Sequence, residues 1–171
     1  MSFSSSNWVD LKAHERFSSY GYGTVAVDYP GFGKSEPSAG FNPASNPDAY
    51  SEFVSRIIST LGLDRVIIVG PSMGGGIALA ALINNIPGIM AGILIAPAYG
   101  SIENRLSRIE VPVLIIWGKN DNVIPLSRGW KLHDLIAGSK LVAVENAGHA
   151  VYLDKPDRFF SIVRDFLEST R

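Results

Sequence analysis

Apolar residues along the chain follow two alternating patterns, short continuous runs and longer stretches with helical spacing. In residues 49–61 they recur at i, i+3 and i+4, which predicts an amphipathic helix that ends at Gly62. The next run, residues 65–69, is continuous and rich in β-branched side chains, as expected of a strand that is buried on both faces. Strands that alternate with helices in this way are typical of a parallel sheet in an α/β protein.

The same patterns assign most of the remaining chain to helices and strands. Further helices are predicted over residues 5–19, 73–85, 127–136 and 156–167. Further strands are predicted over residues 24–28, 92–95, 111–117 and 140–144. A loop rich in Gly, Pro and Ser covers residues 29–48. Because the chain has 171 residues and neither an internal repeat nor a long linker, we expect one domain over residues 1–171.

Composition excludes several classes of function. Apolar residues make up 46% of the chain and charged residues 18%, which is enough apolar material for a buried core. A net charge of −1 argues against binding to nucleic acid or to an anionic membrane surface. There is no cysteine, so disulfides and thiolate metal sites are excluded. No window approaches the ~20 apolar residues of a membrane span, and the first residues lack the pattern of a secretory signal. We therefore expect a cytoplasmic protein.

The strongest chemical signal is the sequence Gly70-Pro71-Ser72-Met73-Gly74, which follows a predicted strand and opens a predicted helix. A serine hydroxyl is a weak nucleophile that needs a fixed, exposed position beside a base, and a sharp strand-to-helix turn supplies one. The competing interpretation is a glycine-rich turn without chemistry. A phosphate-binding loop would need a lysine here, and a dinucleotide-binding turn would need glycine in place of Ser72.

Two further residues complete a candidate triad with Ser72. Asp121 follows the predicted strand 111–117 in a Gly-x-x-Asp turn, and His149 follows the strand 140–144 at a glycine. Each residue alone is typical of an ordinary turn. However, the carboxyl ends of parallel strands lie at one edge of the sheet, and the order Ser, Asp, His is that of one class of triad. We therefore predict that His149 takes the proton of Ser72 and that Asp121 orients His149.

With these residues in hand, the chain resembles the α/β-hydrolase superfamily over its whole length. The matching pieces are the Asp28–Ser35 loop, the Ser72 turn, the Trp117–Asp121 turn and the Gly148–His149 turn. Within the superfamily it is similar to the small group named α/β-hydrolase domain-containing protein 14. That narrower resemblance is carried by the following segments: Phe3-Ser4-Ser5 with Trp8, the short segment before Val111, Ala147-Gly148-His149, and Tyr152-Leu153-Asp154-Lys155-Pro156. The Gly74-Gly75-Gly76 run is closer to the superfamily in general.

The resemblance implies a serine hydrolase that cleaves a small ester, thioester or amide without a cofactor or a metal. It implies a mostly parallel sheet flanked by helices, and oxyanion binding at the Ser72 turn by the amide of Met73, with Gly70 and Gly74 shaping that turn. Residues 96–110 are too few for a helical cap, so an open site for a small acyl-bearing substrate is expected. The candidate pocket walls are Phe32, Met73, Tyr99, Val123 and Tyr152.

The chain departs from the family pattern at its N-terminal side. Members have three strands before the first helix seen here, and the third ends in a His-Gly loop that supplies half of the oxyanion hole. Neither is present in this sequence, which predicts an N-terminally truncated sheet and weak activity. Without the third strand, the predicted strands 24–28 and 65–69 either pair directly or leave an open edge on each. The main alternative is therefore a non-catalytic interaction domain that keeps the triad. A cofactor-free oxidase or peroxidase is a further alternative, and the sequence does not identify a protein partner.

Overall fold

Two units, Met1–Pro47 and Asp48–Arg171, make up the computed structural model of the chain. The structure describes residues 4–39, 41, 48–100 and 102–170. The single domain over residues 1–171 stays a prediction. Within the described ranges, no helix has both the length and the apolar content needed to cross a membrane.

The first unit begins with two short helices, α1 (Ser6–Asp10) and α2 (Ala13–Ser19), where the sequence predicted one continuous helix over residues 5–19. The prediction is wrong at Lys12, which lies between them with φ 51°, in the left-handed region that ends a helix. The predicted strand 24–28 is also wrong. These residues have no strand assignment, because no described strand pairs with them.

Asp28 organises the loop of the first unit. Its carboxylate accepts hydrogen bonds from the amide and hydroxyl of Ser5, at 2.6 and 2.9 Å, and from the amide of Lys34, at 3.0 Å. Its carbonyl oxygen accepts a hydrogen bond from the hydroxyl of Ser35, at 2.7 Å. A Cβ atom on Gly33 would lie 2.3 Å from the same carboxylate. A single carboxylate therefore connects the start of the chain to the 28–35 loop.

Protonation of Asp28 is expected to loosen this unit in acid. The amide of Ser5, followed by the other hydrogen bonds, holds the pKa of Asp28 below its ordinary value of 3.8. Because the pKa is lower in the folded state, the stabilisation is fully present above the unfolded pKa and is lost as pH falls through the folded pKa. Hydrogen exchange of the Ser5 and Lys34 amides should show this loss of protection. The variant Asp28→Asn should exchange several-fold faster at neutral pH and lose the acid dependence, and equal protection in both proteins would contradict the prediction.

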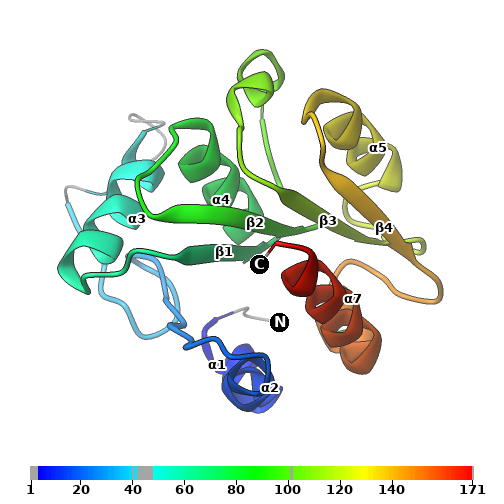
Figure 1. The fold of residues 1–171 in the computed structure, drawn as a ribbon, viewed down its shortest axis with the longest axis horizontal. Coiled ribbons are helices and arrows are strands. Elements are labelled where there is room, and N and C mark those ends of the chain that lie inside the picture. The colour runs from blue at the N-terminus through cyan, green and yellow to red at the C-terminus, as the bar shows by residue number, and fades with distance from the viewer. Residues whose placement is uncertain (1–3, 40, 42–47, 101, 171) are drawn as a thin grey trace. The chain divides into compact units, whose positions relative to one another are not determined.

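A parallel sheet of four strands forms the centre of the second unit (Figure 1). The strands lie side by side in chain order: β1 (Val66–Pro71), β2 (Ile89–Ile95), β3 (Val113–Gly118) and β4 (Lys140–Val144). All three pairings are parallel. The sheet confirms the predicted α/β class, and within the described residues β1 and β4 are its edge strands.

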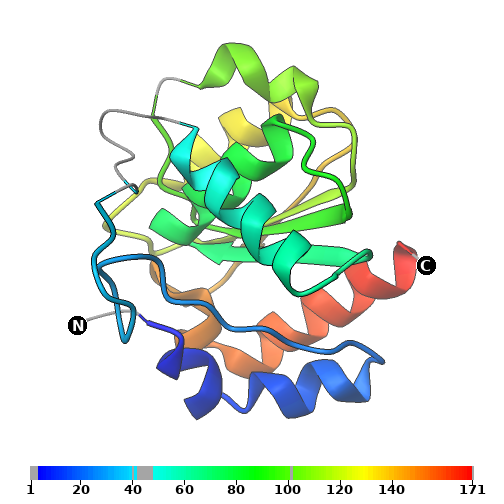
Figure 2. The same cartoon turned by 90° about the vertical axis from the view of Figure 1, so that its left-hand side faces the viewer.

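Helices cover both faces of this sheet. Figures 1 and 2 show α3, α4 and α5 on one face and α7 on the other. The bounds are as follows: α3 (Ala49–Thr60), α4 (Met73–Ile83), η1 (Glu103–Arg108), α5 (Leu126–Leu135), α6 (Val151–Asp154) and α7 (Pro156–Ser169). The sequence did not predict η1 and α6, which are too short to produce a helical period. In the described part of the connection between β2 and β3, η1 is the sole helix, and no cap domain is present.

The strands β2 and β3 are buried on both faces because their side chains alternate between two apolar layers. One layer joins Leu94, Val113, Ile115 and Trp117 to buried residues of α4 and α5, including Leu82 and Leu132. The intervening strand residues point to the face where α7 lies, and they are also buried: Ile93, Ile95, Leu114 and Ile116. The core therefore fixes the strands whose carboxyl ends lead into the candidate catalytic turns.

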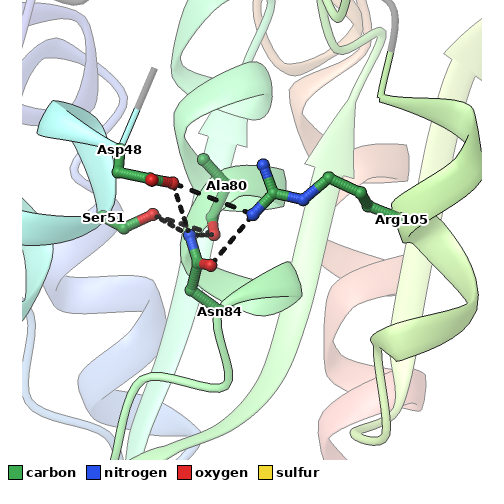
Figure 3. A network of polar contacts seen from close by, with 5 residues as sticks. All are labelled: Asp48, Ser51, Ala80, Asn84 and Arg105. Carbon is green, nitrogen blue, oxygen red and sulfur yellow. Dashed lines mark hydrogen bonds and ion pairs between the residues drawn. The ribbon is translucent and has the colours of Figure 1, made fainter. Parts of the chain in front are cut away.

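A polar network ties the end of α4 to α3 and η1 (Figure 3). The side-chain nitrogen of Asn84, Nδ2, donates to Asp48 at 3.3 Å, to the Ser51 hydroxyl at 2.7 Å and to the Ala80 carbonyl at 3.1 Å. Its oxygen accepts a hydrogen bond from Arg105 at 3.0 Å. A shallow surface pocket of about 410 Å³ adjoins these residues, and its lining includes none of the candidate catalytic side chains. The network is therefore a structural anchor for the helix that begins just after Ser72.

Candidate active site

Ser72 occupies the sharp turn between β1 and α4. Its backbone has φ 50° and ψ −118°, a strained conformation for a residue with a side chain. Four hydrogen bonds hold the turn: the Ser72 amide donates to the carbonyl of Ile95 at 2.8 Å, and the Ser72 carbonyl accepts from Ala98 at 2.8 Å, Gly75 at 3.0 Å and Gly76 at 3.2 Å. Hydrogen bonds to the neighbouring strand, to the loop that follows it and to the first turn of α4 therefore hold Ser72 in this strained conformation.

The first glycine of the Gly-x-Ser-x-Gly sequence allows this turn to be tight. A Cβ atom on Gly70 would lie 2.2 Å from the carbonyl oxygen of Gly74, closer than two such atoms approach each other. Met73 is the first residue of α4, so its amide has no acceptor within the helix and lies at the positive end of the helix dipole. This amide is suited to stabilise an oxyanion that forms beside Ser72.

The next two glycines bring α4 against the loop that follows β2. A Cβ atom on Gly75 would lie 2.6 Å from the Cβ of Pro97, and one on Gly76 would lie 2.1 Å from the carbonyl oxygen of Ala98. Neither approach leaves room for a side chain. The loop after β2 therefore packs directly on the start of the Ser72 helix.

Asp121 and His149 form a hydrogen-bonded pair. His149 Nδ1 lies 2.8 Å from Asp121 Oδ2, and their side chains are 14% and 0% exposed. The other carboxylate oxygen accepts the amides of Val123 and Ile124, at 2.8 and 2.9 Å. Because a carboxylate only accepts hydrogen bonds, Nδ1 is assigned the proton, and Nε2 remains as the basic nitrogen of the neutral ring.

The loops that carry this pair are fastened to each other. Lys119, just before the turn of Asp121, forms an ion pair with Glu145, which follows β4. A Cβ atom on Gly118 would lie 2.1 Å from the carbonyl oxygen of Gly148. This close approach places the loop of His149 directly beside the end of β3.

The three predicted catalytic residues follow the carboxyl ends of three strands in one parallel sheet. Ser72 follows β1, Asp121 follows β3 and His149 follows β4. The structure brings Asp121 and His149 into contact, whereas its hydrogen bonds among the described residues include none between Ser72 and His149. Such bonds are often long in unliganded enzymes. In the same described ranges, no group of three or more His, Asp or Glu residues could hold a metal ion.

The predicted pocket walls divide into buried and exposed residues. Tyr99 is 9% exposed, donates a hydrogen bond to the carbonyl of Arg128 at 3.0 Å, and lies under that guanidinium at 4.2 Å. Tyr152 is 3% exposed, and burial raises its pKa to about 12. Both rings are therefore used in packing. Met73 and Val123 are exposed, as is Phe32 in the first unit. The roles of all five residues at a pocket stay predictions.

Asp154 has a contact that the sequence did not indicate. Its Oδ2 accepts the amide of Gly148 at 2.7 Å. The interaction reaches six residues back along the chain, to the residue before His149. An aspartate shortly after a Gly-His pair is the sole sequence signal, and it is too common to identify this contact.

Comparison with known proteins places the chain in a family. A family model described as alpha/beta hydrolase fold matches residues 3–106 and 93–156. Protein ABHD14A of Mus musculus is 31% identical over 97% of this chain, and the match spans 66% of that relative. The putative protein-lysine deacylase ABHD14B of Rattus norvegicus is 30% identical over 97% of this chain and 79% of that relative.

Solved structures agree with the sequence comparison. A predicted CIB-like hydrolase from Thermoplasma acidophilum has a TM-score of 0.92 and 32% identity, over 98% of this chain and 82% of that one. The carboxylesterase CesB from Bacillus subtilis has a TM-score of 0.86 and 21% identity, over 96% of this chain and 80% of that one, which shows the shared fold. The chain therefore belongs to the α/β-hydrolase family.

Proposed function

We propose that the protein is a serine hydrolase that cleaves a small ester, thioester or amide through an acyl-enzyme on Ser72. The observation that carries the proposal is the Asp121–His149 hydrogen bond of 2.8 Å, at the sheet edge where Ser72 occupies a strained turn. A buried carboxylate that holds one nitrogen of a histidine leaves the other nitrogen to act as a base.

The reaction follows from these groups. His149 Nε2 takes the proton of Ser72 as its hydroxyl oxygen attacks the carbonyl carbon of the substrate. The Met73 amide donates to the resulting oxyanion. Collapse of this intermediate breaks the bond to the leaving group, which receives the proton from His149. A water molecule, deprotonated by the same nitrogen, then hydrolyses the acyl-enzyme to release the acid and restore Ser72.

The substrate class follows from the short connection over the sheet edge. Between β2 and β3 the described chain has η1 in place of a cap, which suits small acyl groups on large or exposed leaving groups. The relative ABHD14B is named a putative protein-lysine deacylase. Acylated lysine, whose amide is carried by a large protein, is therefore included among the candidate substrates beside simple esters.

The test is covalent labelling with a fluorophosphonate, which reacts with activated serines. We expect one adduct, located by mass spectrometry on the peptide that contains Ser72, and no adduct on the variant Ser72→Ala. A folded protein without an adduct on Ser72, and without hydrolysis of an activated ester, would favour the alternative of a non-catalytic interaction domain.

A further inference from the structure

The loop that carries His149 is held by a side chain outside the proposed triad. Asp154 is the last residue of α6, a single helical turn that begins two residues after His149. Its backbone amide donates to the carbonyl of Ala150 at 3.0 Å, which closes the turn. Its carboxylate reaches back and accepts the amide of Gly148 at 2.7 Å.

A second contact fixes the same loop on its other side. The amide of Asn120, next to Asp121, donates to the carbonyl of Ala147 at 2.9 Å. Ala147 is thus attached to the Asp121 loop, and Gly148 is attached to Asp154. Ala147 and Gly148 directly precede His149, so the orientation of the imidazole depends on both of these hydrogen bonds.

The hydrogen bond between Gly148 and Asp154 is important because residue 148 is a glycine. Glycine has the widest conformational freedom of any residue, and this one immediately precedes His149. A Cβ atom at Gly148 would lie only 3.2 Å from Asp154 Oδ2, so glycine also allows the carboxylate to approach closely. A hydrogen bond to an ionised acceptor is shorter and stronger than one between neutral groups. The carboxylate of Asp154 therefore restrains the glycine that directly precedes His149.

We infer that Asp154 is a positioning residue for the reaction: by fixing Gly148, it keeps Nδ1 of His149 on Asp121. The inference rests on the proposed function, because it assigns Asp154 a role through His149. The contact lies at the surface, where water can replace the lost acceptor, so its removal should affect the position of His149 more than the stability of the fold.

The test compares three variants in the full chain. Asp154→Ala removes the acceptor, Asp154→Asn keeps an acceptor oxygen at the same place, and Asp134→Ala removes an exposed carboxylate on α5 as a charge-matched control. Ester hydrolysis and the rate of fluorophosphonate labelling report on the reaction. The Nδ1–H resonance of His149, observed by NMR, reports directly on its bond to Asp121.

For Asp154→Ala we expect kcat and the labelling rate to fall by about 10–100-fold, because a displacement of about 1 Å can cost 10²-fold. KM should be little changed, and the Nδ1–H resonance should broaden or disappear. Asp154→Asn should recover most of the rate and the resonance, and Asp134→Ala should match the wild type. All melting temperatures should stay close together.

Two outcomes would overturn the inference: wild-type rates and an intact resonance in Asp154→Ala, or an equal loss in Asp154→Ala and Asp154→Asn. The NMR measurement separates this result from the fate of the proposed function. If the wild type neither hydrolyses esters nor labels at Ser72, the proposed function fails. The resonance of His149 in the variants still decides whether Asp154 holds it on Asp121.

Discussion

Replacing Ser72 by alanine is expected to lower kcat for an activated ester by about 10⁶-fold, and Asp121→Asn by about 10⁴-fold. The first change removes the nucleophile. The second leaves the shape of the site but removes the negative oxygen that lies 2.8 Å from His149 Nδ1. Both rates are measured as initial hydrolysis of a chromogenic ester under identical conditions.

The effect of Asp121→Asn follows from its two oxygens. Asp121 Oδ1 accepts the amides of Val123 and Ile124, and an asparagine oxygen can keep both bonds. The amide nitrogen of asparagine then replaces Oδ2 and donates to Nδ1 of His149. That exchange favours the tautomer with its proton on Nε2, which can no longer accept the proton of Ser72. The loop is therefore preserved while the base is lost.

Stability measurements control this prediction. Because Asp121→Asn keeps the loop bonds, and Ser72→Ala deletes one hydroxyl from a strained turn, both variants should melt within a few degrees of the wild type. Asp134→Asn, at an exposed position on α5, should have the wild-type rate. Retention of substantial turnover by Ser72→Ala would show that another group is the nucleophile.

The strands of the second unit could be predicted from the sequence because residues that favour turns lie next to them. The strand β4 has the predicted limits, Lys140–Val144, since Gly138 precedes it and Asn146 turns the chain after it. The strand β2 begins at Ile89, three residues before the predicted start, because Ala91 and Gly92 have low strand propensity and obscure an apolar run that begins at Ile89. The observed ends of the helices differ from the predicted ones by one or two residues, because capping residues and helix propensities do not define a helix end more closely.

The errors lie where structure depends on distant partners or on unusual backbone angles. Residues 24–28 have a strand-like apolar run, but a strand requires a neighbour to bond with, and a run of side chains does not specify one. Lys12 adopts φ 51°, for which lysine has no sequence signature. Both errors fall in the first unit.

In the candidate site, too, some features could be predicted from local sequence and others depend on residues that are distant in the chain. The order of Ser72, Asp121 and His149 predicted that their strand ends would share one sheet edge, and the structure adds the direct contact of the last two. The contact of Asp154 with Gly148 could not be predicted, because it depends on how one turn of helix folds back. The need for glycine at 75 and 76 likewise arises from the approach of a loop distant in sequence.

Gly76→Ala is expected to lower the free energy of unfolding by roughly 2–3 kcal/mol, which corresponds to a fall in melting temperature of about 5–10 °C. Its new Cβ would lie 2.1 Å from the carbonyl oxygen of Ala98, a backbone atom that cannot rotate away. Alanine normally favours a helix over glycine by up to about 1 kcal/mol, so the clash must outweigh this gain. Thermal unfolding followed by circular dichroism measures the difference.

Gly74→Ala is the matched control, because it makes the same chemical change two residues earlier in α4. There a Cβ would meet only the Cδ of Pro71, at 3.4 Å, so we expect a melting temperature equal to or above that of the wild type. Gly76→Ala should also slow ester hydrolysis. The displaced Ala98 donates its amide to the carbonyl of Ser72 at 2.8 Å, and a shift of this loop moves the nucleophile. Equal melting temperatures for the two variants would mean that the loop after β2 does not press on α4 at Gly76.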